Sequence, residues 1–186
     1  FFVESKKKQF AELLDTIIIN NNINSDEYTV SVYGEWAGEG IQKGIGISSL
    51  EKSFYVFGIK VSKPNDEEFK SYWLDSSNIK HSFDRIYNID EFDTFSIDID
   101  FNKPDLVQNK LAELTESIEK ECPVAKKFGI ENGLGEGIVW STTYNDVVYR
   151  FKVKGFKHSA TKVKTLAKVD VEKLDSIYSF VEHTVT

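Results

Sequence analysis

The sequence predicts an α+β fold in which antiparallel sheets are flanked by helices. Alternation is the first observation, because Tyr55, Phe57 and Ile59 fall on one face of a strand over residues 54–61. Helical spacing of apolar residues near the amino terminus is the second. The third is a Tyr-Asn-Asp turn at Tyr144 between two strand-like runs, which indicates a hairpin.

Two periodicities predict the first helix and the first strand. Apolar residues recur at helical spacing across residues 5–20, which is typical of an amphipathic helix. After a polar break, Val30 and Val32 share one face of a strand expected over residues 28–36. The glycine-rich stretch over residues 34–46 then predicts a loop with several unusual backbone angles.

Shorter elements follow in the middle and last third of the chain. A short helix is expected over residues 67–73, with strands over residues 85–89 and 94–100; in the latter, Phe95 and Ile97 share one face. The remaining expected elements are a helix over residues 106–120 preceded by Pro104, a loop over residues 122–134, a hairpin of strands over residues 137–142 and 147–153, and a helix over residues 169–181.

Length and composition fit one domain across residues 1–186, with 40% hydrophobic and 28% charged residues. The sequence contains neither an apolar run of membrane-spanning length nor a signal peptide, so we expect no membrane partner. A lone cysteine, Cys122, favours a reducing compartment such as the cytoplasm. Because the chain begins with Phe1 and has no methionine, we expect a piece truncated at its amino terminus, and its last residues suggest a cut at the carboxyl terminus as well.

Charge is unevenly distributed in this acidic chain. The net charge is −7, yet residues 147–169 contain no Asp or Glu. That basic window holds Arg150, Lys152, Lys154, Lys157, Lys162, Lys164 and Lys168. A basic window in an acidic protein suggests a polyanionic ligand, although a solvated lysine-rich surface is the plainer alternative.

A Lys-x-Lys strand stands at the head of this basic window. Since side chains alternate along a strand, Lys152 and Lys154 share one face, with ammonium groups about 7 Å apart. Such a pair can bind the oxygens of one phosphate and stabilise its developing charge. The alternative is an edge strand protected by lysines.

Two acidic residues lie beside glycines at strand ends. Glu136, in the run Gly-Glu-Gly-Ile-Val, could bind a hydroxyl or a divalent cation, and its glycine neighbours would allow the backbone to approach a ligand closely. Glu35, in the run Tyr-Gly-Glu-Trp-Ala-Gly, could accept hydrogen bonds from ribose hydroxyls. An exposed glutamate in a tight turn is the alternative for Glu136.

Taken together and in their order along the chain, which is Glu35, then Glu136, then the Lys-x-Lys run, the motifs resemble those of the covalent nucleotidyltransferase superfamily, and in particular the ATP-dependent RNA ligases. The resemblance covers residues 28–168 and implies a nucleotidyltransferase fold. It implies that Glu35 binds the adenosine ribose and that Phe57 stacks on adenine. Many members have Asp where this chain has Gly58, and Tyr55 could take the place of Phe57. Glu136 would act near the metal and the reactive phosphate, while Lys152 and Lys154 would contact the α-phosphate.

The family also uses a nucleophilic lysine in a Lys-x-x-Gly motif upstream of Glu35, which this chain does not show. The resemblance implies that such a lysine attacks ATP, that AMP passes to an RNA 5′-phosphate, and that a 3′-hydroxyl then seals the RNA, with Mg²⁺ or Mn²⁺ as cofactor. The lysine is expected outside this chain, which alone should not self-adenylylate. We expect a monomer of phage or viral origin whose RNA contacts come from Lys157, His158, Lys162 and Lys164. The alternatives are a DNA ligase or capping relative and a non-catalytic nucleotide- or nucleic-acid-binding module.

Overall fold

The computed structural model describes residues 2–75, 83–100, 102–145, 147–158, 170 and 172. The chain divides into two compact units, each described here by itself. The first contains Phe1–Asp93 and Thr142–Tyr149, and the second contains Thr94–Ser141 and Arg150–Thr186. A single nucleotidyltransferase domain across residues 1–186 stays a prediction.

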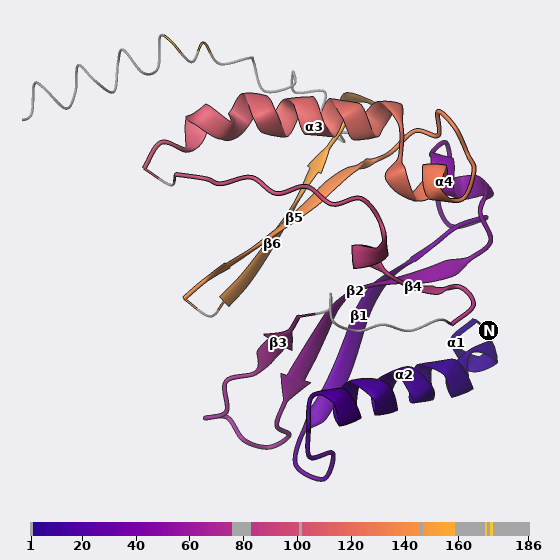
Figure 1. Cartoon of the computed structure of the whole chain (residues 1–186), viewed down its shortest axis with the longest axis vertical. Helices are drawn as coiled ribbons and strands as arrows, with labels where there is room; N and C mark the ends of the chain where they lie inside the picture. Colours follow the sequence, from indigo (N-terminus) through magenta and orange to yellow (C-terminus); the bar gives the residue numbers. More distant parts are fainter. Residues whose placement is uncertain are drawn as a thin grey trace, which may run out of the picture. The chain divides into compact units, whose positions relative to one another are not determined.

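The first unit is built on a four-stranded sheet, as far as the described residues show (Figure 1). Its strands are β1 (Thr29–Ala37), β2 (Ser53–Ser62), β3 (Tyr72–Leu74) and β4 (Ile86–Asn88). The antiparallel neighbour β1 follows one edge of β2, while antiparallel β3 and parallel β4 share the other edge. Its helical elements are α1 (Phe2–Ser5), α2 (Lys7–Asn20), η1 (Gly46–Ser49) and η3 (Ile89–Glu91), of which η1 and η3 are 3-10 helices.

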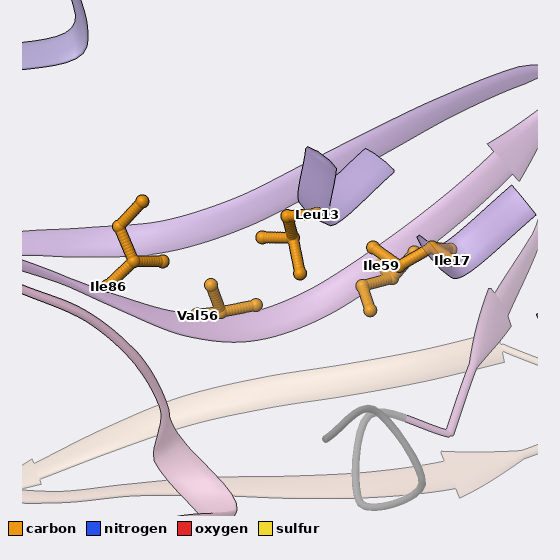
Figure 2. Packing of buried hydrophobic residues seen from close by; sticks show 5 residues of the cluster. All are labelled: Leu13, Ile17, Val56, Ile59 and Ile86. Carbon is orange, nitrogen blue, oxygen red and sulfur yellow. The ribbon is translucent and has the colours of Figure 1, made fainter. Parts of the chain in front are cut away.

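The core of this unit forms between α2 and the sheet (Figure 2). Leu13 and Ile17, four residues apart on one face of α2, pack against Val56, Ile59 and Ile86. All five side chains are at most 2% exposed. The first helix, the first two strands and the α+β class predicted from the sequence are therefore confirmed.

A β-bulge interrupts the ladder between β1 and β2. The pairing register shifts between Tyr33 and Gly34, which leaves Phe57 of β2 with no residue opposite it. The bulge explains why Val56 and Ile59, three residues apart, both lie in the core, whereas regular alternation would place them on opposite faces. The expected uninterrupted alternation over residues 54–61 is corrected at this point.

Replacing Ile17 with alanine should lower the free energy of unfolding by about 2–5 kcal/mol, because the change leaves a cavity in this core. Ile19 of the same helix is the matched control, since its side chain is 72% exposed and that of Ile17 is 0% exposed. Ile19→Ala should change the free energy of unfolding by no more than about 0.5 kcal/mol. Chemical denaturation measures both, and equal losses in the two variants would contradict the orientation of α2.

The second unit contains α3 (Gln108–Lys120), which follows η4 (Pro104–Val107), a 3-10 helix with Pro104 in its first turn. The other elements are α4 (Pro123–Lys127), β5 (Gly137–Tyr144), β6 (Val147–Lys154) and the 3-10 helix η5 (Phe156–His158). β5 and β6 form a sheet of their own, whose tip belongs to the first unit. Asn145, between the two strands, has a left-handed φ of 48° that suits a tight turn. The predicted helix after Pro104 and the predicted hairpin are confirmed.

The short helix expected over residues 67–73 is wrong. This segment makes a turn and then enters β3 at its end. Asp66 accepts a hydrogen bond from the backbone N–H of Phe69 at 3.1 Å and pairs with Lys63 at 2.9 Å. Such local bonds between side chain and backbone compete with helix formation. Trp73 pairs with Lys60 of β2, so its spacing from Phe69 imitates a helix without forming one.

The strand expected over residues 94–100 is also wrong, because these residues belong to no strand. Alternating Phe95 and Ile97 favour an extended chain, but a strand also needs a neighbour for its backbone hydrogen bonds. The side chain of Asp100 instead accepts a bond from the backbone N–H of Asn102 at 2.9 Å, which turns the chain.

The loop expected over residues 122–134 contains the short helix α4. Pro123 occupies its first turn, and Gly129, with φ of 81°, lies just beyond its last residues. Proline at the start and glycine past the end of a helix is the usual asymmetry, so the sequence did carry this signal. The final helix predicted over residues 169–181 lies outside the described residues, except for residues 170 and 172.

Candidate active site

Glu136, Lys152 and Lys154 form a triad of ion pairs in the second unit. The Nζ atom of Lys152 lies 3.0 Å from Oε2 of Glu136, and Nζ of Lys154 lies 2.7 Å from Oε1. Each carboxylate oxygen therefore contacts a different ammonium group. Two ammonium groups and one carboxylate leave the triad with a net positive charge.

The base of the β5–β6 hairpin brings these three side chains together. The two lysines lie two residues apart on β6 and so point to the same side of the strand. Glu136 directly precedes β5, and its carbonyl accepts a hydrogen bond from the N–H of Gly155, which directly follows β6. This bond continues the strand pairing by one step and holds the Glu136 backbone opposite the end of the Lys-x-Lys run.

The triad is partly shielded from solvent. The side chain of Glu136 is 28% exposed, and those of Lys152 and Lys154 are 34% and 41% exposed. The hydrogen bond from Lys154 holds the pKa of the Glu136 carboxyl below its usual value, and Lys152 acts in the same direction, while partial burial opposes both. Glu136 is therefore a carboxylate at neutral pH, and the lysine pair carries an anion between its two ammonium groups.

The glycines around the triad serve packing within the protein. A Cβ atom on Gly137 would collide with the carbonyl of Val153, and Gly137 also has a positive φ of 154°. A Cβ atom on Gly135 would collide with the carbonyl of Ile118 in α3. From the sequence, these glycines were expected to let the backbone approach a ligand closely. In the structure, the space they leave is filled by the backbone of β6 and α3.

Glu35 and Phe57, which were predicted to contact the nucleotide, lie on β1 and β2 of the first unit. Glu35 is exposed and pairs across the ladder with Tyr55. Phe57 occupies the bulge and is 39% exposed. Tyr55 is only 6% exposed and packs against the rings of Tyr87 and Phe92. Of the two aromatic residues considered for adenine stacking, Phe57 therefore has the more accessible ring. The loop predicted over residues 34–46 is confirmed from Gly38 onward, by positive φ values at Gly38, Gly40 and Gly44, whereas residues 34–37 belong to β1 and Gly46 begins η1.

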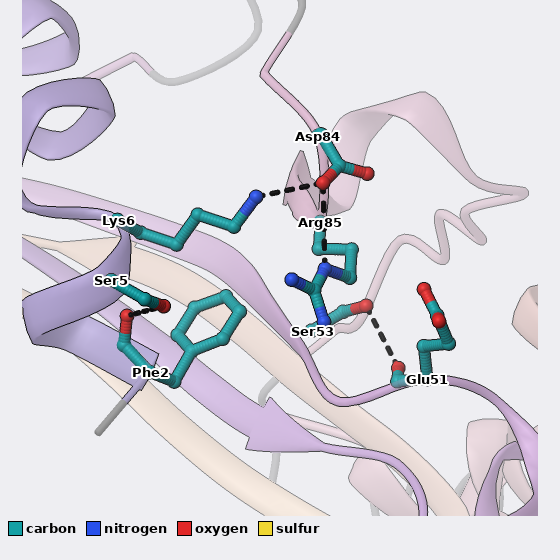
Figure 3. Close-up of polar contacts among 7 residues, drawn as sticks. All are labelled: Phe2, Ser5, Lys6, Glu51, Ser53, Asp84 and Arg85. Carbon is teal, nitrogen blue, oxygen red and sulfur yellow. Dashed lines mark hydrogen bonds and ion pairs between the residues drawn. The ribbon is translucent and has the colours of Figure 1, made fainter.

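Lys6, one of three lysines upstream of Glu35, is part of a structural ion pair (Figure 3). Its side chain is 8% exposed and its Nζ atom lies 2.7 Å from Oδ2 of Asp84. The hydrogen bond from Lys6 lowers the pKa of the Asp84 carboxyl. Nearby, the Arg85 guanidinium lies over the ring of Phe2 at 5.6 Å. The sequence excludes Lys6 as a nucleophile because no glycine follows at the right place, and its burial in an ion pair agrees with that exclusion.

One Lys-x-x-Gly run, Lys126 to Gly129, does occur in this chain, but it follows Glu35, whereas the nucleophile motif of the family precedes that residue. In the structure, this run is the end of α4. Lys126 pairs with Glu121 at 2.6 Å, and the N–H of Gly129 bonds to the carbonyl of Lys126. The run therefore terminates a helix, as its glycine with positive φ suggests.

Only part of the predicted RNA-binding set falls on described residues. Lys157 is exposed on η5, whereas Nε2 of His158 is buried and has no hydrogen-bond partner among the atoms that the structure describes. Lys162 and Lys164 lie outside the described residues. Among all the residues that the structure describes, no group of three or more His, Cys, Asp or Glu side chains is arranged to hold a metal ion.

Sequence reasoning missed one residue next to the triad, Glu119 of α3. Its Oε1 atom accepts a hydrogen bond from the backbone N–H of Lys157 at 2.6 Å. The two residues are 38 positions apart, so no local spacing could have indicated the contact. Only the folded structure brings Glu119 next to the triad.

Comparison with known proteins yields no relative for this chain. No protein-family model matches it, and neither curated proteins nor solved structures give a significant match. The resemblance to RNA ligases therefore rests on the motifs themselves, and the nucleotidyltransferase fold stays a prediction. A separate finding concerns membranes: within the described ranges, no helix is both long and apolar enough to cross a bilayer.

Proposed function

We propose that this chain is the adenylyltransferase domain of an ATP-dependent RNA ligase, in which Lys152 and Lys154 bind the α-phosphate of ATP. The observation that carries the proposal is the triad, because residues from two separate motifs come together: Glu136 lies within ion-pair distance of both Lys152 and Lys154. An edge strand protected by lysines would not require a carboxylate between them.

The lysine pair suits an oxyanion because it already binds one. The Glu136 carboxylate presents two oxygens to two ammonium groups at 2.7 and 3.0 Å, which are distances of charge-assisted hydrogen bonds. A phosphate presents oxygens of the same kind with more charge. During phosphoryl transfer, charge spreads over these oxygens, so fixed cations beside them stabilise the transition state.

In the proposed reaction, a lysine nitrogen forms a bond to the α-phosphorus of ATP and pyrophosphate leaves. AMP then passes to the 5′-phosphate of RNA, and attack by a 3′-hydroxyl releases AMP and seals the strand. The motif pattern does not assign the nucleophilic lysine within this chain. Its residues would bind and orient the nucleotide: Glu35 through the ribose, Phe57 through the adenine face and the lysine pair through the phosphate.

Glu136 is the proposed residue for a divalent cation. One carboxylate beside a phosphate site fits Mg²⁺, which proteins commonly hold by one or two carboxylates together with substrate phosphates. Mn²⁺ also accepts carboxylate oxygens. When bound, the cation would neutralise charge on the phosphates. The chain's own contribution is to keep Glu136 ionised, which the neighbouring ammonium groups do by lowering the pKa of its carboxyl.

RNA is the proposed polymer substrate, with Lys157, His158, Lys162 and Lys164 as candidates for contacts to its backbone. Contacts between lysines and phosphates release counterions, so RNA affinity should fall as salt rises. Preference for RNA over DNA would depend on contacts to the 2′-hydroxyl, and comparing the sealing of nicked RNA and nicked DNA separates the two substrates.

The proposal is tested by incubating this chain, and a longer protein that contains it, with radiolabelled ATP and Mg²⁺, followed by denaturing electrophoresis. We expect an acid-labile label on the longer protein and none on this chain. Absence of label on dephosphorylated, AMP-free longer protein would refute the adenylyltransferase function and favour a non-catalytic nucleotide-binding module.

A further inference from the structure

The carboxyl-terminal end of α3 contacts both flanks of the triad. The carbonyl of Ile118 accepts a hydrogen bond from the N–H of Gly135 at 3.0 Å, directly before Glu136. Glu119 accepts the bond from the N–H of Lys157 at 2.6 Å, three residues after Lys154. Two consecutive residues of one helix thus hold the two chain segments that carry the carboxylate and the lysines.

Glu119 also packs against Gly155, which lies between Lys154 and Lys157. A Cβ atom on Gly155 would lie only 2.5 to 3.0 Å from three side-chain atoms of Glu119, so the side chain lies directly against Gly155. The N–H of Gly155 donates to the carbonyl of Glu136 at 3.0 Å. Glu119 therefore fixes a turn whose first peptide is bonded to Glu136 itself.

These contacts use groups that a helix end leaves available. The last four carbonyls of a helix have no partner within the helix, and the Ile118 carbonyl belongs to this set. A charged acceptor forms a stronger hydrogen bond with a backbone N–H than a neutral one does. The turn after β6 is therefore tied to α3 by a strong bond as well as by packing.

We propose that Glu119 is a positioning residue, which holds the turn after β6 so that Lys154 and Lys152 face Glu136 at ion-pair distance. The importance of this role for catalysis rests on the proposed function. The effect of residue 119 on the geometry of the triad can be tested without that function, because it predicts how the triad responds to substitutions at residue 119. A purely structural cap on η5 would affect stability and leave the triad unchanged.

The triad itself provides the readout, through a pH titration of the ¹³C chemical shift of the Glu136 side-chain carboxyl. The signal is assigned by its loss in Glu136→Gln. Glu119→Ala should raise the pKa of Glu136 towards the ordinary value of 4.5, because the two ammonium groups move away. Loss of the Glu119 charge alone would lower the pKa of Glu136, so a rise cannot come from that charge.

Three further variants sharpen the test. Glu119→Gln keeps an oxygen acceptor for the Lys157 N–H and should keep the low pKa of Glu136. Glu119→Asp keeps the charge but withdraws the acceptor, so it should raise that pKa, and it serves if Glu119→Ala fails to fold. Glu116→Ala, an exposed site one helical turn earlier, is the matched control and should change nothing. Alanine at these positions favours helix, so α3 should persist.

Binding of AMP, measured by calorimetry without divalent cations, links the triad to function. We expect Glu119→Ala to weaken AMP binding about tenfold and Glu119→Gln to restore it. An unchanged pKa of Glu136 in both Glu119→Ala and Glu119→Asp, or no rescue by Glu119→Gln, would overturn the positioning role. If wild-type chain binds no AMP but the pKa of Glu136 responds as expected, the positioning role stands and the proposed function fails.

Discussion

Lys154→Ala should lower the rate of the proposed ATP-dependent RNA sealing about 100- to 1,000-fold, in a longer protein that contains this chain and the proposed nucleophilic lysine. The reason is the loss of a fixed cation beside the phosphate on which charge develops. Lys154 makes the shorter of the two contacts to Glu136, at 2.7 Å, and its hydrogen bond is the largest cause of the lowered pKa of the Glu136 carboxyl. Single-turnover sealing of nicked RNA at saturating ATP measures the effect.

Lys110→Ala is the matched control for this prediction. Lys110 lies on α3, its side chain is 57% exposed, and its Nζ atom lies 3.8 Å from the Glu113 carboxylate. Its replacement therefore removes one positive charge that is not part of the triad. Both variants should melt within a few degrees of wild type, because partly exposed ion pairs contribute little to stability. A sealing rate near wild type in Lys154→Ala would refute the phosphate role of the pair.

Glu136→Gln should have two effects of opposite direction. Sealing should fall at least about 100-fold, since the proposed metal ligand is lost. Binding of AMP without divalent cations should instead become about tenfold tighter, because the two ammonium groups no longer bind a competing carboxylate. The expected tightening of AMP binding follows from one observation: the Glu136 oxygens lie 2.7 and 3.0 Å from the two lysine ammonium groups that the phosphate would bind.

Glu131→Gln is the charge-matched control, because it removes one carboxylate from the exposed loop before the triad. It should leave sealing unchanged and AMP affinity within about twofold of wild type, as screened surface charges act weakly at this range. If Glu136→Gln binds AMP more weakly than wild type in a chelator such as EDTA, the carboxylate does not compete with phosphate, and the second prediction fails.

The predictable part of the fold is the part that local periodicity determines. α2 and β1 have regular apolar patterns, β2 alternates on either side of its bulge, and the β5–β6 hairpin has a turn sequence between its strands; each forms near its expected bounds. Expectations failed where a local bond or a missing neighbour outweighed the pattern. Asp66 accepts a backbone hydrogen bond that forms a turn where a helix was expected, and the alternating residues Phe95 and Ile97 pair with no strand among the described residues.

The same distinction applies to the candidate site. That Lys152 and Lys154 share a face follows from a period of two, which the sequence shows directly. Their meeting with Glu136 depends on how the hairpin closes, and the motif order alone could only suggest it. The contact from Glu119 could not be anticipated, because it joins residues 38 positions apart through a backbone N–H that no sequence pattern identifies.

Phe57 makes β2 a strand with a built-in insertion. Without Phe57, Val56 would directly precede Gly58 in the strand, and the side chains that pack in the core with α2, from Phe54 through Val56 to Ile59, would alternate without interruption. Deleting one residue from a strand normally turns every later side chain to the wrong face. At this position the deletion would restore a regular pairing, so β2 should tolerate shortening better than it tolerates a polar residue at Val56. The sheet thus retains a large aromatic side chain at a place where its hydrogen-bond ladder does not require a residue at all.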